Sequence, residues 1–133
     1  MKRYNIGEIY WVNLKQDKHV QGGWHPAVIV QNNVGNRYSP TIAVVPITSK
    51  KKSSLPTHVP IKEGTFGLPK ASIVQCEGQR PVNKLDIGEF IGEVNSTTMK
   101  QIANACLINT PLLNFLTAVD IARLQNQSLS LCS

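Results

Sequence analysis

Two apolar runs separated by turn residues constrain the fold of this chain more than any other feature. The runs Ala27–Val30 and Ile42–Ile47 are rich in β-branched residues, and each is bounded by turn residues. Short uninterrupted runs of this kind are typical of buried strands. Between them, Asn33–Asn36 and Ser39-Pro40 supply turn chemistry. We therefore expect two strands that lie side by side in one sheet.

The pairing of these strands would bring an imidazole close to a hydroxyl group. His25 stands just before the first run, and Thr48 ends the second run, where the basic loop Ser49–Lys52 begins. We expect His25 and Thr48 to be neighbours with lysines alongside, a group suited to chemistry on phosphate. The alternatives are a purely structural histidine and a lysine triplet that is no more than a solvated loop.

Further strands are predicted by short segments of strand-forming residues between turn signals. These segments are Gly7–Leu14, Thr57–Ile61, Ala71–Glu77 and Phe90–Val94. Prolines at 56 and 60 place the second of these segments at the edge of the sheet. Several short strands with turn signals between them predict a small barrel.

Two helices are predicted after the last strand. Asn95 or Ser96 caps the first helix, whose apolar positions follow the i, i+3, i+4, i+7 pattern at Met99, Ile102, Ala103 and Cys106. Thr110 and Pro111 suit the N-cap and first position of a second helix, with an apolar stripe from Leu112 to Leu124. We expect this stripe to pack on the barrel, and the alternative is that it serves a partner. The segment 125–133 is predicted to be a frayed tail. The fold class is mainly β with C-terminal helices.

The composition of the chain limits which partners and which cellular compartment we expect. A chain of 133 residues is expected to form one domain, and its formal net charge of +6 favours polyanions such as RNA, although many basic domains bind none. No apolar run is long enough to cross a bilayer, and polar residues follow Met1-Lys2-Arg3 where a signal peptide would carry its apolar core. We expect a cytoplasmic protein that has no membrane partner.

The cysteines and histidines do not have the spacing of metal ligands. Cys76, Cys106 and Cys132 lie far apart in the sequence, and no Cys-x-x-Cys pair is present. We therefore predict no metal site, and buried reduced thiols at Cys76 and Cys106.

Several motifs occur in the same order as in the MazF/PemK (Kid) toxin endoribonucleases, and the chain resembles that family over residues 4–110. The matching segments are Gln21-Gly22-Gly23-x-x-Pro26, Val28–Asn32, Gly35–Thr41, Ile47-Thr48, Leu55–Val59, Ser72–Val74, Glu77 and Arg80. The main departure is His25, which stands where the family usually carries arginine.

The resemblance implies both a fold and an activity. It implies an SH3-like barrel of the CcdB/MazF type at residues 1–110, with 111–133 as a C-terminal helical extension of the same domain. It also implies the toxin of a toxin–antitoxin pair, a homodimer that cleaves single-stranded RNA (mRNA) at specific sequences without metal or cofactor. The products would be a 2′,3′-cyclic phosphate and a 5′-hydroxyl. The implied protein partner is an acidic, MazE-like antitoxin, with DNA reached only indirectly through the antitoxin complex.

The resemblance also implies roles for individual residues. Thr48 and His25 occupy the positions tied to cleavage. The expected RNA-binding residues are Gln21, Gly22, Gly23, Asn32, Lys50, Lys51, Glu77 and Arg80. For Arg80, an equally weighted alternative is a structural ion pair with Glu77 or Asp86.

Two other classes of function stay open at this point. Imidazole is a better proton acceptor than guanidinium at neutral pH, but it lacks the permanent charge and the bidentate fork. The chain could therefore be a catalytically weakened homologue that only binds RNA or antitoxin. It could also be a gyrase poison of the CcdB type, which would act through its C-terminal helix. The Gly-Gly-x-x-Pro loop with Ile-Thr downstream favours the nuclease.

Overall fold

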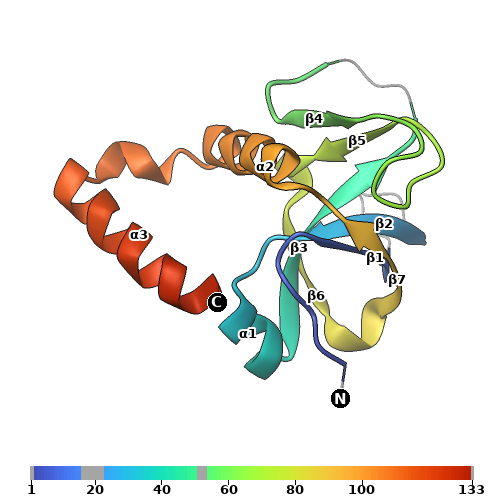
Figure 1. Cartoon of the computed structure of the whole chain (residues 1–133), viewed down its shortest axis with the longest axis horizontal. Coiled ribbons are helices and arrows are strands. Elements are labelled where there is room, and N and C mark those ends of the chain that lie inside the picture. The colour runs from blue at the N-terminus through green and yellow to red at the C-terminus, as the bar shows by residue number, and fades with distance from the viewer. Residues whose placement is uncertain (1, 16–22, 51–53, 133) are drawn as a thin grey trace.

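A computed structural model of the chain describes residues 2–15, 23–50 and 54–132. Gln21, Gly22 and Lys51 of the expected RNA-binding set lie outside these residues. Within the described residues, a strongly curved antiparallel sheet has the strand order β4-β5-β3-β2-β1-β7, and β6 pairs with β3 (Figure 1). The strands are β1 (Glu8–Asn13), β2 (Trp24–Ile29), β3 (Thr41–Thr48), β4 (His58–Ile61), β5 (Ser72–Gln75), β6 (Arg80–Asn83) and β7 (Ile87–Glu93). The predicted fold class is confirmed, as a barrel-like sheet that is not closed.

Strand β3 is the centre of the sheet. Along one edge it pairs with β2, in the register Ala27↔Pro46, Val28↔Val45 and Ile29↔Val44. Along its other edge its first half pairs with β6 and its end with β5. The prediction that the two apolar runs pair is therefore confirmed, and β4 lies at the sheet edge as its prolines indicate.

The apolar runs are uninterrupted because each strand buries both of its faces. Val28 and Val45 belong to one hydrophobic cluster, which α2 (Ser96–Asn109) covers through Ile102. Ala27, Ile29 and other neighbours belong to a second cluster on the opposite face of the sheet. Alternating side chains of one strand thus supply two separate cores, and no position in the runs is left for a polar residue.

The region between β2 and β3 differs from the expected turn. Residues Asn33–Tyr38 form a short helix, α1, and the side chain of Asn32 caps it by accepting a hydrogen bond from the Gly35 backbone N–H at 2.8 Å. Asparagine and glycine are turn residues, but asparagine is also a preferred N-cap, and here the cap prevails.

The first C-terminal helix, α2, begins where the sequence predicts. The Asn95 side chain accepts a hydrogen bond from the Thr98 backbone N–H at 2.8 Å. Its buried residues are Thr98, Ile102 and Ala105. Ile102 was expected on this face, but Ala103 is exposed, so that part of the predicted stripe is wrong. The helix packs against β4 and the 3-10 helix η1 (Cys76–Gly78). This packing turns a slightly different face of α2 towards the core than the one predicted.

The predicted second helix is wrong in its start and its end. After α2 the chain forms a 3-10 turn, η3 (Leu112–Phe115), and only then the helix α3 (Ala118–Cys132), which includes most of the expected tail. Thr117 and Asp120 cap α3 reciprocally, with the Thr117 N–H donating to Asp120 at 3.0 Å and the Asp120 N–H donating to Thr117 Oγ1 at 3.2 Å. This capping box starts a new helix, and it overrides the Thr110-Pro111 signal.

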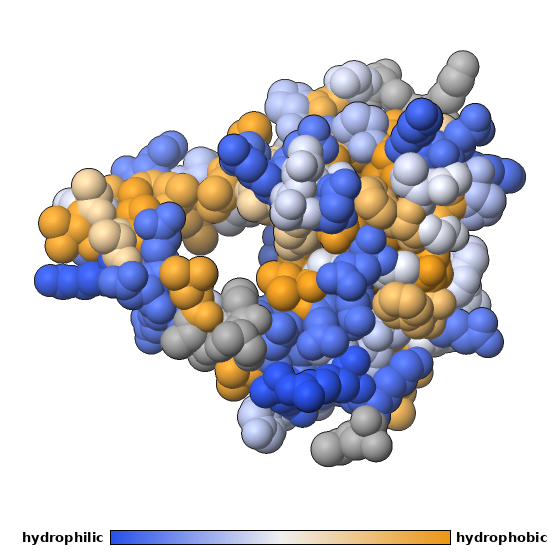
Figure 2. Space-filling model, viewed as in Figure 1, coloured by the Kyte–Doolittle hydropathy of each residue, from blue (hydrophilic) through white to orange (hydrophobic). Residues whose placement is uncertain are grey.

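Helix α3 stands away from the sheet, and Figure 2 shows an opening between the C-terminal helices and the rest of the molecule. The apolar side chains of Leu112, Phe115, Val119 and Leu129 are exposed. The expected packing of this stripe on the barrel is therefore wrong. None of the helices among the described residues has the length and apolar content that a membrane span requires.

Candidate active site

His25 and Thr48 line the same cavity. The β2–β3 register pairs Ala27 with Pro46, and its continuation by two residues on each strand sets His25 opposite Thr48. The cavity has a volume of about 570 Å³ and opens at this end of the two strands. Strand pairing alone therefore explains why residues that are 23 positions apart (48 minus 25) share a site.

The charges around this cavity are positive. Lys50 lies two residues after Thr48, just past the end of β3, and Lys70 lines the cavity from the segment before β5. Among the described residues that line the cavity there is no aspartate or glutamate. Two ammonium groups in an apolar concavity raise the local concentration of anions, so the cavity is suited to a phosphate group.

The Thr48 hydroxyl is held with its proton available. Its Oγ1 accepts a hydrogen bond from the Lys50 backbone N–H at 3.2 Å. A hydroxyl that accepts in this way still has its own O–H to donate. Thr48 can therefore donate a hydrogen bond to a ligand oxygen in the cavity, from a position that the turn after β3 determines.

Exposed aromatic rings form one wall. Trp11 in β1, Trp24 in β2 and Phe90 in β7 line the cavity, although 41%, 53% and 54% of their surfaces are accessible to solvent. Trp24 lies over Gly88, where an added Cβ would come within 3.0 Å of the indole ring. The exposure of Trp24 at the cavity favours a role as a stacking face over a core position.

The segment 67–70, which also lines the cavity, packs closely against β7 at two glycines. A Cβ at Gly67 would clash with the Ile91 carbonyl, and a Cβ at Gly92 would clash with the Phe66 carbonyl. The segment 67–70 and β7 therefore approach backbone to backbone. Gly67 also has a φ of +83°, so a side chain there would be disfavoured by the backbone conformation as well as by the clash. This contact positions Lys70.

Four of the described residues that were predicted to bind RNA do not line the cavity, namely Gly23, Asn32, Glu77 and Arg80. Asn32 caps α1 at the other end of β2, and Arg80 donates from Nε to the Gly78 carbonyl at 3.1 Å. Glu77 hydrogen-bonds Thr57 and His58 instead. The alternative ion pair of Arg80 is also absent from the described residues, since Asp86 pairs with Lys15. Gly23 lies just before Trp24, with a φ of +100°.

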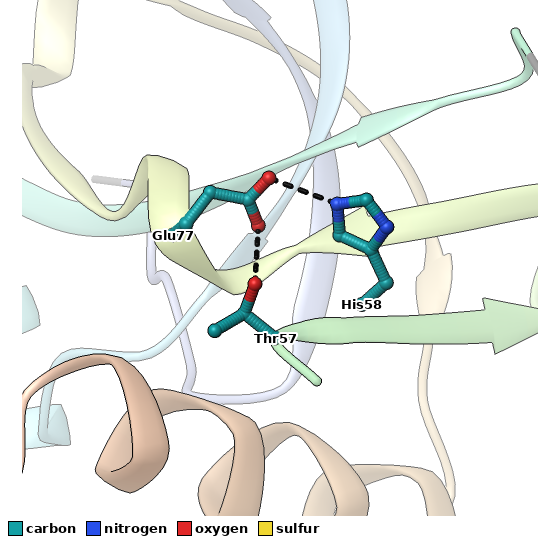
Figure 3. A network of polar contacts seen from close by, with 3 residues as sticks. All are labelled: Thr57, His58 and Glu77. Carbon is teal, nitrogen blue, oxygen red and sulfur yellow. Dashed lines mark hydrogen bonds and ion pairs between the residues drawn. The ribbon is translucent and has the colours of Figure 1, made fainter. Parts of the chain in front are cut away.

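A second polar cluster joins β4 to η1 (Figure 3). Glu77 accepts from Thr57 Oγ1 at 3.0 Å through one carboxylate oxygen, and contacts His58 Nε2 at 2.9 Å through the other. Burial alone would raise the pKa of Glu77, but hydrogen bonds from His58, the backbone and Thr57, and the charge of His58, bring it below its usual 4.5. His58 Nδ1 is buried without a hydrogen-bond partner in the described part of the chain. The cluster holds β4 and η1 together.

No three of the described histidine, cysteine, aspartate and glutamate residues gather into a group that could hold a metal ion. The sequence did not indicate Lys70, Trp11 or Phe90 as site residues. An exposed tryptophan in a strand whose neighbours are buried is the one local signal that could have indicated Trp11.

Comparison with known proteins identifies the family. A family model described as "PemK-like, MazF-like toxin of type II toxin-antitoxin system" matches residues 5–109. The chain belongs to this PemK/MazF toxin family. The match ends at the last residue of α2, so η3 and α3 lie outside it.

Relatives with this fold include proteins described as endoribonucleases. The endoribonuclease MazF of Staphylococcus saprophyticus is 36% identical over 108 residues, which are 80% of this chain and 90% of that protein. An endoribonuclease from a mycobacterial species, solved in complex with its cognate antitoxin, is similar with a TM-score of 0.70 and 26% identity, over 82% of this chain and 96% of that one. MazF from Deinococcus radiodurans, at 20% identity and a TM-score of 0.72 over 81% and 96% of the two chains, supports the fold alone.

Proposed function

We propose that this PemK/MazF protein is the toxin of a toxin–antitoxin pair and cleaves single-stranded RNA without a metal ion. The observation that carries the proposal is the shared cavity, where His25 and Thr48 stand together with two lysines. RNA is a polyanion that contains its own nucleophile, the 2′-hydroxyl. A cavity with a proton acceptor, a hydroxyl donor and positive charge offers what attack by that nucleophile needs.

The reaction is an internal transfer at phosphorus. Neutral His25 accepts the 2′-OH proton as the 2′-oxygen forms its bond to phosphorus. Thr48 donates a hydrogen bond to a non-bridging oxygen, and the ammonium groups of Lys50 and Lys70 stabilise the dianionic phosphorane. The bond from phosphorus to the 5′-oxygen then breaks, that oxygen takes a proton from solvent, and His25 returns to solvent the proton that it accepted. The products are a 2′,3′-cyclic phosphate and a 5′-hydroxyl.

The aromatic wall fits the bases next to the scissile phosphate. Each base has a face that can stack on an indole or phenyl ring, and RNA that is single-stranded exposes those faces. Trp24 and His25 line the same cavity, so a base stacked on the indole would lie near the reacting group. This arrangement favours single-stranded over double-stranded substrate.

Assembly with partners follows from the family and from the charge of the chain. A relative of the same fold was solved with its cognate antitoxin. With a net charge of +6, this chain would attract an acidic antitoxin segment to the surface that attracts RNA. We further propose that the working form is a homodimer, since extended ligands of this kind are well bound by a symmetric groove.

The proposal is tested by incubating the purified protein with a long single-stranded RNA in EDTA. We expect primer extension to show cleavage at defined sequences. The new 5′ ends should accept phosphate from a polynucleotide kinase without prior phosphatase treatment, because they are 5′-hydroxyls. Thr48→Ala should reduce the rate at least tenfold, whereas Thr41→Ala, at the other end of β3, should leave it unchanged.

Other results would point elsewhere. A strict requirement for Mg²⁺ or products with 5′-phosphates would contradict the mechanism. Binding of RNA or antitoxin without cleavage by the wild type would identify the chain as the weakened homologue that the His25 substitution also allows.

A further inference from the structure

Two cysteines that the proposed function does not use lie where η1 packs against α2. Cys76 is fully buried in η1, and its thiol donates toward the Ile102 carbonyl of α2 at a distance of 3.9 Å. Cys106 lies one helical turn beyond Ile102, and its side chain packs against the hydrophobic cluster that contains Cys76. Residues 30 positions apart (106 minus 76) therefore bring their side chains to the same hydrophobic cluster.

The two thiols differ in their environment. The interaction with Cys106, burial and the nearby charge of Glu77 raise the pKa of the Cys76 thiol, whereas the interaction with Cys76 lowers the pKa of Cys106 against the effect of its burial. Cys106 is also only partly buried, and it lines a cavity of about 280 Å³ among the leucines of α2, η3 and α3. Of the pair, Cys106 has the greater thiolate character and is the one that a small reagent can reach.

We propose that Cys106 and Cys76 form an oxidisable dithiol, a modification site that a hydroperoxide converts into an intramolecular disulfide. The Cys106 thiolate attacks one peroxide oxygen, so that an S–O bond forms, the O–O bond breaks and hydroxide leaves. The Cys76 sulfur then attacks the Cys106 sulfenic acid. An S–S bond forms, the S–O bond breaks, and the hydroxyl departs as water with the Cys76 proton. Two thiols lose two electrons in total, and one hydroperoxide is reduced.

The bond would join η1 to α2. Glu77 follows Cys76 directly, and it carries the polar cluster with Thr57 and His58. The disulfide would thus connect the β4–η1 side of the sheet covalently to the helix that leads into η3 and α3. A bridge that closes a loop of this length restricts the unfolded chain, so the oxidised protein should melt at a higher temperature than the reduced one.

The experiment treats the reduced full-length protein with hydrogen peroxide, blocks remaining thiols with iodoacetamide and maps the peptides by mass spectrometry. We expect a peptide that links Cys76 to Cys106, lower in mass by two hydrogens, with loss of two of the three alkylatable thiols. Dithiothreitol should restore both. Cys132→Ser, which removes the remaining cysteine, should leave the linkage intact.

Single variants separate the two steps. In Cys76→Ser, Cys106 should accumulate as a sulfenic acid that dimedone traps, while Cys106→Ser should prevent the intramolecular bridge altogether. If serine at the buried position 76 prevents folding, the wild type and Cys106→Ser still decide the question. The proposal is overturned if Cys76 and Cys106 stay alkylatable under conditions that oxidise free glutathione, or if the only disulfide formed is intermolecular through Cys132.

Discussion

At the scale of single residues, we propose that His25 is where the chemistry of this chain departs from that expected of its family. Arginine would supply a permanent charge and a two-pronged donor, whereas imidazole can accept a proton near neutral pH. The cavity already contains the ammonium groups of Lys50 and Lys70. Charge is therefore present without arginine, and a proton acceptor is what His25 adds.

This reasoning predicts the pH dependence of cleavage. Because the neutral imidazole is the working form of a base, the cleavage rate should be lower at acidic than at neutral pH. His25→Ala should lower the rate by roughly a hundredfold. Rates measured with a fluorogenic RNA from pH 5.5 to 8 test both statements. A rate that instead rises towards low pH would mean that His25 acts as a cation in the manner of arginine.

His25→Arg is the matched comparison. Guanidinium does not titrate near neutrality, so the profile of this variant should be flat across the same range. Equal rates for the wild type and His25→Ala at every pH would show that the imidazole takes no part in the reaction.

The second prediction at this scale concerns Trp24. Stacking of a base on an aromatic ring contributes about 1–3 kcal/mol, so Trp24→Ala should raise KM roughly 5- to 150-fold with a smaller effect on kcat. Trp24→Phe should recover most of the loss. Gly88→Ala is an indirect control, since its new methyl group must displace the indole by a few tenths of an ångström. An unchanged KM in Trp24→Ala would remove this ring from the binding site.

At the scale of elements, the contact between β4 and η1 depends on the Glu77 carboxylate. Its pKa is lowered on folding, so the folded state favours the ionised form. The stabilisation is therefore fully present above the pKa of the unfolded chain and is lost as the pH falls through the lower pKa of the folded state.

We predict that Glu77→Gln destabilises the protein at pH 7 by about 1 kcal/mol, a modest value because the side chain is partly exposed to solvent. The difference from the wild type in the free energy of unfolding should shrink below pH 4.5, the ordinary value for this carboxyl. Urea denaturation at several pH values measures it. Glu63→Gln, an exposed glutamate in the turn after β4, is the control and should change little. If the difference in the free energy of unfolding grew as the pH was lowered, the pKa of Glu77 could not be lowered on folding.

At the scale of the whole molecule, the family-like part and the C-terminal extension are expected to be separable. The family match stops at residue 109, and α3 stands away from the sheet with its contacts directed at α1. A chain that ends after Thr110 should keep a cooperative thermal transition and its cleavage activity. Circular dichroism and the RNA assay check these two outcomes, and loss of the cooperative transition would mean that the extension is part of the folding unit.

Local signals determined much of this molecule. The two apolar runs predict β2 and β3, because a strand buried on both faces tolerates no polar residue between its apolar positions. Asn95 predicts the start of α2, because the cap depends only on a side chain and a backbone N–H three residues away. The neighbourhood of His25 and Thr48 also follows from sequence, because antiparallel pairing of adjacent strands sets their register.

Only the tertiary structure decided the rest of the cavity and the position of the C-terminal helices. Trp11, Lys70 and Phe90 come from three separate elements, and no spacing in the sequence relates them. Glu77 is held by residues about twenty positions earlier, which no local pattern indicates. The apolar stripe of the last helix predicts that one face of this helix is apolar, but it does not predict which part of the molecule covers that face. Contacts between segments that lie far apart in the sequence form only when the whole chain folds. The sequence alone therefore determined the strands and the helix caps, but not the walls of the cavity.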